Sequence, residues 1–202
     1  MQIHYAPDTV ALASLITLEE IGVPYTPVRV DFSRNAQRAE PYLTLNPKGR
    51  VPVLVTPQGT LSETPAILTW LGQSFPPANL LPADPFGFAR VQELMAYLCS
   101  TVHVSHAHKR RGARWSDDPA VVEALALKVT RNMADHFSYL EQRFTGPFAI
   151  GDQYTIADPY LHTLSRWLEG DGVDLARYPR IAAHFTAMTA RPAVRRALAV
   201  QG

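Results

Sequence analysis

Asn46-Pro-Lys-Gly-Arg-Val-Pro-Val-Leu-Val55, followed by Leu61-Ser-Glu-Thr64, is the stretch around which this chain is organised. Pro47 and Gly49 predict a tight turn, because proline presets φ and glycine tolerates positive φ. Residues 51–55 are expected to form a short apolar strand, and a hairpin turn leads into a second strand. The stretch therefore predicts a β-hairpin with a helix behind it.

Backbone and side-chain groups in this stretch suit a peptide-like ligand. The Val51–Pro52 bond is a candidate for the cis isomer, which leaves the N–H and C=O of Val51 facing outward. Free backbone groups of this kind pair with a peptide laid alongside as an extra strand. Glu63 and Thr64, at the start of the next helix, add a carboxylate, a hydroxyl and helix-terminal N–H groups. The set suits the ammonium and carboxylate of an amino-acid-like ligand; the alternative is a plain hairpin without a ligand.

The segments around the hairpin complete a small mixed sheet. Residues 2–5 and 25–30 are expected to be strands, and the helix between them begins near residue 9 or 10 and ends at Gly22. Residues 31–45 are irregular and compatible with helix or loop. A helix over residues 65–72 follows the hairpin, so the order of elements predicts an α/β layer.

Proline density marks residues 75–85 as a linker, and the rest of the chain is expected to be helical. Two apolar stripes at helical spacing predict two helices. The first stripe comprises Val91, Leu94, Met95, Leu98 and Val102, and the second Val121, Leu125, Val129, Met133, Phe137 and Leu140. Thr155-Ile-Ala-Asp158 is a capping-box variant that starts a helix through Trp167. A last long helix is expected to close at Pro192.

Composition excludes several classes of protein. The 202 residues carry a formal net charge of +1, so nothing indicates a general attraction to nucleic acid or membrane. A local basic run at Arg110, Arg111 and Arg114 is interpreted as a solvated helix end. The single cysteine permits no internal disulfide, and no signal peptide or membrane-spanning apolar stretch is visible. We therefore expect a soluble cytoplasmic protein with no nucleic-acid or membrane partner.

Residues 46–52 and 62–67 resemble the glutathione-binding signature of the glutathione S-transferases. Residues 1–7, 12–18 and 155–161 are similar to the bacterial beta class in particular. The resemblance implies a thioredoxin-like α/β N-terminal domain plus an all-α C-terminal domain, the glutathione transferase fold. It also implies glutathione as co-substrate, no metal, a homodimer and a role in detoxification.

Domain boundaries and binding residues follow from the same resemblance. We expect a glutathione-binding domain over residues 1–75, a linker over 76–86 and a helical domain over 87–202. The residues expected to bind glutathione are Val10, Arg34, Val51, Pro52, Glu63 and Thr64.

Glutathione chemistry needs a thiolate, and a helix N-terminus lowers the pKa of a thiol from about 8.5. The Thr9 hydroxyl and the Val10 N–H are the candidate donors, unless Thr9 only caps the helix. The beta class usually carries a cysteine where this chain has Val10, so thiol exchange is not expected there. Tyr5 is a rival activator by analogy with other classes, against the alternative of a buried strand tyrosine. His103 matches the beta-class histidine near the sulfur.

Other residues on the same predicted helix have different expected roles. His106 lies one turn beyond His103 and is expected to line the electrophile pocket. A metal site with His108 is not expected, because no carboxylate or cysteine ligand stands beside the histidines. Ala96 replaces the asparagine that the family uses to reach glutathione across the dimer. Cys99 is expected to be an inert buried cysteine.

The sequence therefore predicts a glutathione transferase that joins the glutathione thiolate to a small hydrophobic electrophile. The alternative is a non-catalytic glutathione-binding or ligand-carrier protein, suggested by the missing cysteine and asparagine. A third, weaker hypothesis is an interaction module that uses only the dimer scaffold.

Overall fold

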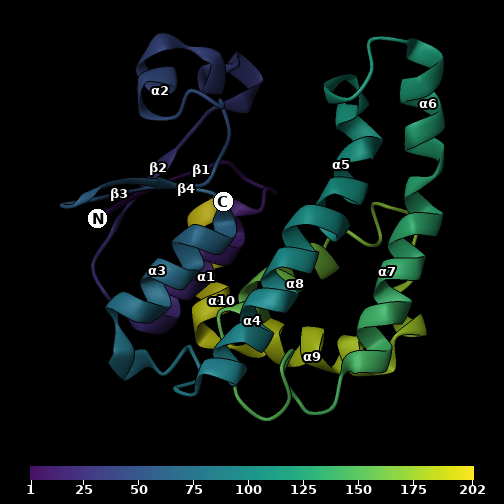
Figure 1. Ribbon diagram of the computed structural model, residues 1–202. Helices are drawn as coiled ribbons and strands as arrows, with labels where there is room; N and C mark the ends of the chain where they lie inside the picture. Colours follow the sequence, from purple (N-terminus) through teal and green to yellow (C-terminus); the bar gives the residue numbers. More distant parts are fainter.

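The computed structural model describes residues 1–202 and builds a small sheet beside a larger set of helices (Figure 1). The strands are β1 Gln2–Tyr5, β2 Thr26–Arg29, β3 Val53–Thr56 and β4 Gly59–Ser62, in the order β2-β1-β3-β4. β1 and β2 are parallel, and the other two pairs are antiparallel. Helices α1 (Ala11–Ile21) and α3 (Thr64–Ser74) lie on one side of the sheet and α2 (Glu40–Leu45) on the other (Figure 1).

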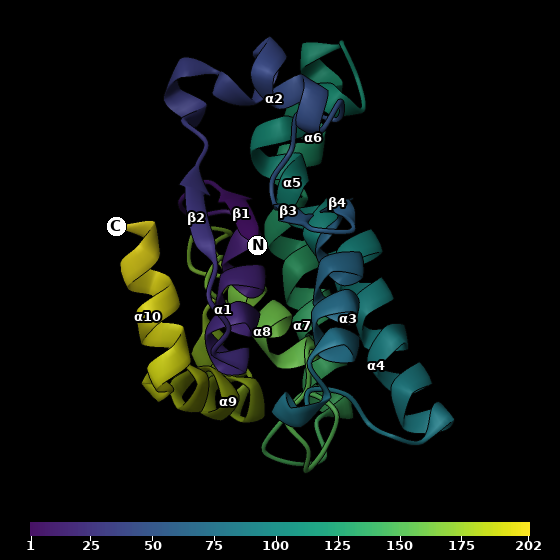
Figure 2. The same cartoon turned by 90° about the vertical axis from the view of Figure 1, so that its left-hand side faces the viewer.

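Seven helices form the rest of the chain, and the last of them lies beside α1 (Figure 2). They are α4 Pro85–Tyr97, α5 His103–Arg111, α6 Pro119–Leu127, α7 Val129–Arg143, α8 Ala157–Ser165, α9 Pro179–Ala190 and α10 Pro192–Gln201. A π-helical turn, Leu98–Val102, joins α4 to α5 without a break in the helical path. No helix is long and apolar enough to cross a membrane. The α/β domain followed by an all-helical domain confirms the expected fold class.

Three expectations about helices and strands are corrected. β3 begins at Val53, because Val51 has no partner in the sheet. The stripe over residues 121–140 belongs to two helices that break at Lys128. The first of these, α6, buries none of its residues, so its apolar positions do not mark one continuous core helix. The expected last helix, α9, ends just before Pro192 as predicted but is not the last, because Pro192 opens α10 and proline suits a first helical turn.

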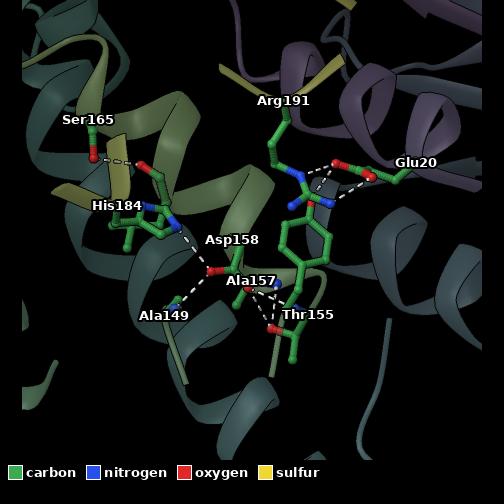
Figure 3. Close-up of polar contacts among 10 residues, drawn as sticks. Glu20, Ala149, Thr155, Ala157, Asp158, Ser165, His184 and Arg191 are labelled. Carbon is green, nitrogen blue, oxygen red and sulfur yellow. Dashed lines mark hydrogen bonds and ion pairs between the residues drawn. The ribbon is translucent and has the colours of Figure 1, made fainter. Parts of the chain in front are cut away.

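Half of the expected capping box at the start of α8 is present, since the Thr155 hydroxyl oxygen accepts from the Ala157 N–H instead of the Asp158 N–H, whereas the Asp158 carboxylate makes more contacts than predicted (Figure 3). Asp158 is fully buried and accepts from the Thr155 N–H at 2.7 Å. The same carboxylate accepts from the Ala149 N–H at 2.8 Å and lies 3.0 Å from Nε2 of His184 on α9. One carboxylate thus joins the preceding loop, α8 and α9.

Helix α1 belongs to both cores of the protein. Leu12, Leu15 and Ile16 pack in the core that the sheet forms with α3 and α10. Val10 and Ala13, on the other side, pack in the core of the helical domain. The N-terminus of α1 is therefore fixed between the two domains.

A buried histidine in α8 predicts acid sensitivity. His162 is fully buried, neither ring nitrogen has a hydrogen-bond partner, and burial lowers its pKa to about 3. In the unfolded chain the pKa of histidine is about 6.5, so between these values only the unfolded state binds the proton. The free energy of unfolding should therefore fall below pH 6.5, by up to about 1.4 kcal/mol per pH unit from this residue.

Urea unfolding at several pH values between about 7 and 5 measures this slope. His162→Leu should show a shallower loss of stability than the native protein, since the variant has no ring to protonate. Parallel pH profiles for the two proteins would contradict the expectation.

Candidate active site

A cleft of about 410 Å³ lies between the α/β domain and the helical domain. One wall comes from the starts of α1 and α3, the segment around the short turns before α2, and the turn before β3. The opposite wall comes from the π-helical turn, α5, the turn after it, α8 and the residues following α8. Both domains therefore contribute to one site.

Glu63 and Thr64 form one end of the cleft. Glu63 has a φ of 76°, a left-handed conformation that is uncommon for a residue other than glycine. Its carboxylate forms an ion pair with Lys48, whose ammonium also donates to Ser62 Oγ at 2.7 Å. Thr64 is buried at the first position of α3, where backbone N–H groups have no intrahelical acceptor. This end offers a carboxylate for an ammonium and N–H donors for a carboxylate.

The turn before β3 presents a free backbone edge. The Val51–Pro52 bond is cis, as expected, and both residues line the cleft. The Arg50 carbonyl is held by the Tyr42 hydroxyl at 2.7 Å and the Asn46 amide at 2.8 Å. The N–H and C=O of Val51 form no backbone hydrogen bond. Val51 therefore has one donor and one acceptor available for a peptide ligand.

The start of α1 supplies backbone donors. The Thr9 hydroxyl donates to the Ala6 carbonyl at 2.7 Å, and its oxygen lies 3.4 Å from the Ala11 nitrogen. The hydroxyl proton is thus engaged within the protein, which favours the capping role for Thr9. The N–H groups of Thr9 and Val10 have no protein acceptor, and both residues line the cleft. Near the positive end of the helix dipole, the Val10 N–H is the available donor for an anion.

His103 faces the cleft from the start of α5. Burial is the largest cause that lowers its pKa to about 3, followed by the charges of His106 and three arginines, so the ring is neutral at pH 7. The Tyr160 hydroxyl lies 3.5 Å from its Nδ1. A hydroxyl can donate to or accept from Nδ1, so either neutral tautomer fits this contact, and Nε2 is the nitrogen that remains for a ligand.

His106 also lines the cleft, as expected, and it has a partner that the sequence did not predict. Its Nδ1 lies 2.8 Å from Oδ2 of the buried Asp171, and its ring stacks on Trp167 at 4.2 Å between centroids. The carboxylate fixes the ring and leaves Nε2 for the cleft. Asp171 follows α8 and lies far from His106 in sequence, so only the tertiary structure joins them. No group of three or more metal-ligating side chains is present.

Tyr5 and Arg34 lie outside the cleft, which corrects both assignments. The Tyr5 hydroxyl donates to the Val200 carbonyl on α10 at 2.7 Å, so the side chain points away from the site. It is the buried strand tyrosine of the alternative interpretation. The Arg34 side chain is 87% exposed and lies 3.6 Å from Asp31 in its own turn.

Five arginines line the cleft, none of which was assigned to the site from the sequence: Arg38, Arg50, Arg110, Arg111 and Arg114. Arg110, Arg111 and Arg114 are exposed at a helix end, as expected, and they also form part of the site wall. A helix end can be exposed to solvent and line a cleft at the same time, and composition does not show whether a cleft is present.

Cys99 lies in the π-helical turn and lines the cleft instead of being fully buried. Burial, followed by the charge of Glu63, raises the pKa of its thiol. A raised pKa keeps the thiol protonated, which agrees with the expectation that this cysteine is unreactive.

Comparisons with known proteins agree with this architecture. The family model described as glutathione S-transferase, N-terminal domain, matches residues 4–73, and the C-terminal domain model matches residues 94–192. The chain is 32% identical to glutathione S-transferase GstA of Escherichia coli O157:H7, covering 100% of this chain and 99% of that protein. It is 30% identical to a maleylpyruvate isomerase of Ralstonia sp., covering 90% and 88%.

Solved structures show the same fold together with a ligand. A glutathione transferase homologue from Sulfitobacter, crystallised with bound glutathione, has a TM-score of 0.94 and 41% identity over 96% of this chain and 95% of that one. The matches cover both domains and nearly the full length. This chain belongs to the glutathione S-transferase family.

Proposed function

We propose that this protein adds the thiolate of glutathione to a small electrophile. The observation that carries the proposal is that Glu63, Thr64, Val51 and the start of α1 all line one cleft. These would hold the γ-glutamyl ammonium and carboxylate, the cysteinyl backbone and the sulfur in that order. Structures of relatives with bound glutathione support the assignment.

In the proposed reaction the thiol loses its proton to solvent, and the thiolate is stabilised by the Val10 N–H and the dipole of α1. The neutral His103 ring donates a second hydrogen bond through Nε2. The sulfur then attacks the electrophilic carbon, a carbon–sulfur bond forms, and the electron pair leaves with a halide or moves onto an adjacent activating group. His106, held by Asp171, is the side chain placed to orient the electrophile.

Two solution measurements test the proposal. Calorimetry should show saturable binding of glutathione, and a conjugation assay with 1-chloro-2,4-dinitrobenzene should show enzyme-dependent thioether formation. Glutathione binding without turnover of any electrophile tried would favour the carrier alternative. Absence of glutathione binding would reject both.

A glutathione-dependent isomerase is a second candidate. In such a reaction the thiolate adds to an activated double bond and leaves again after bond rotation, so no conjugate accumulates. The similarity to a maleylpyruvate isomerase and the arginines in the cleft favour this candidate. Product analysis by mass spectrometry separates the two reactions, because only conjugation consumes glutathione.

We further propose a cytoplasmic homodimer. The reduced glutathione that the reaction consumes and the single free cysteine agree with a reducing compartment. Phe86, at the start of α4, is a large apolar side chain that is 76% exposed, which agrees with a covered surface in an assembly. Light scattering should give the mass of two chains.

The position of the sulfur can be tested at Val10. With Cys99→Ser as background, Val10→Cys places a thiol at the positive end of α1, where thiolate is favoured. Its attack on oxidised glutathione should form a mixed disulfide and release one reduced glutathione. Intact-mass spectrometry should show one glutathione added to the double variant and none to Cys99→Ser alone. A double variant that binds glutathione but stays unmodified would place the sulfur elsewhere.

A further inference from the structure

The cleft is lined by more positively charged side chains than its acidic residues can neutralise. Five arginines line it, against only two carboxylates, Asp8 and Glu63, and Glu63 is already paired with Lys48. None of the five forms an ion pair or a side-chain hydrogen bond. Outside the cleft, some arginines pair with carboxylates, such as Arg191 with Glu20, whereas others, such as Arg177, are exposed and unpaired. The cleft thus concentrates unpaired guanidinium groups in a chain whose net charge is only +1.

The positive charges of these arginines repel one another. Burial lowers the pKa of Arg111, and the charge of Arg50 lowers it further. The pKa of Arg114 is lowered to about 10 by burial and by the charges of Arg111, Arg50 and Arg38. An anion bound among these groups removes the repulsion and forms charge-assisted, often bidentate, hydrogen bonds.

Glutathione accounts for the arginines of the α/β domain. With its γ-glutamyl end at Glu63 and its cysteine along Val51, the glycine carboxylate lies beyond Val51, toward Arg50 and Arg38. Arg38 packs against this same turn, since a Cβ on Gly49 would lie 3.0 Å from its Nη1. These two arginines are therefore placed to neutralise the glycine carboxylate.

The three arginines of the helical wall have no such partner. Arg110 and Arg111 are the last residues of α5, and Arg114 lies in the short turn that follows. They lie seven or more residues beyond His103 along the helical path, which is roughly 10 Å at 1.5 Å per residue. Trp115, with 46% of its surface exposed, adds a flat apolar surface at the same end. A substrate that spans the distance from the sulfur to these arginines would have its reactive carbon near the sulfur and an anionic group near the arginines.

We propose that the electrophile is an anion whose carboxylate, or a comparable oxyanion, binds Arg110, Arg111 and Arg114. This rests on the proposed glutathione chemistry and replaces the expected hydrophobic electrophile with a charged one. This assignment is compatible with both conjugation and isomerisation, since in each reaction the thiolate attacks an electrophile whose anionic group the arginines can hold.

The test compares two ligands that differ in one carboxylate, S-(4-carboxybenzyl)glutathione and S-benzylglutathione, by calorimetry with the intact protein. The native protein should bind the carboxylated ligand at least tenfold more tightly, and higher salt should reduce the ratio. In the Arg111→Gln, Arg114→Gln double variant the ratio should fall to about one. Arg177→Gln, an exposed arginine without an ion pair outside the cleft, is the matched control and should keep the native ratio. Thermal unfolding verifies that both variants remain folded.

The possible results are distinguishable. If the native protein binds glutathione and both ligands with equal affinity, the anionic substrate is refuted and the proposed function stands. If the double variant weakens both ligands equally, the helical-wall arginines serve glutathione, and the inference is also overturned. If neither ligand nor glutathione binds, the proposed function fails and the inference fails with it.

Discussion

Replacing Asp158 with alanine should lower the free energy of unfolding by about 3–5 kcal/mol, because it leaves several buried polar groups unsatisfied at about 1–3 kcal/mol each. The carboxylate is fully buried and accepts from the N–H groups of Thr155 and Ala149. The variant leaves both donors unsatisfied, and His184 loses its only hydrogen-bond partner in the interior. Urea unfolding of the native and variant proteins measures the difference.

Asp174→Ala is the matched control. Asp174 also caps a helical turn, accepting from the Ala176 N–H at 2.9 Å, but it is exposed to solvent. Its loss should cost about 1 kcal/mol or less, the usual range for an exposed cap. Equal losses in the two variants would show that Asp158 acts only as an ordinary cap. A larger loss for Asp158 supports its role in joining the loop, α8 and α9.

The cleft depends on the same junction. α8 carries Tyr160, and Trp167 lies just beyond its end; both line the cleft on the helical side. The Ile156 N–H, just before α8, donates to the Leu80 carbonyl at 3.0 Å and so ties α8 to the segment between the domains. Weakening the Asp158 contacts should therefore loosen the cleft wall as well as the fold.

Replacing Glu63 with alanine should weaken glutathione binding by roughly tenfold to a hundredfold. A charge-assisted bond between a carboxylate and an ammonium contributes about 1.5–3 kcal/mol when well placed. The variant would also leave the Lys48 ammonium without its partner, and this charge repels the ammonium of glutathione. Calorimetry with glutathione measures the change.

Glu63→Gln separates charge from backbone effects. The φ of 76° at this position strains any side chain, and glutamine keeps the size of the native residue while removing its charge. If charge dominates, the glutamine variant should lose most of the affinity that alanine loses. An unchanged affinity in both variants would remove Glu63 from the glutathione site.

The sequence by itself determined the order of the strands with helices α1 and α3, and one face of the cleft. The turn around Pro47 and Gly49, the cis bond at Pro52 and the helix start at Thr64 are local features, each set by residues adjacent in the chain. Such features follow from backbone preferences that do not depend on distant contacts. The glutathione side of the site is built almost entirely from them, so it could be predicted.

Only the tertiary structure decided the opposite face and the roles of several polar residues. Tyr5 and Arg34 are close in sequence to the predicted site, yet the strand and the short turn point their side chains elsewhere. His106 is joined to Asp171 across 65 residues, and the exposed arginines at and after the end of α5 also line the cleft. A polar or charged side chain needs either water or a polar partner, but the sequence does not show which of the two it contacts in the folded protein. That choice depends on how the two domains pack against each other, because residues from both domains line the cleft.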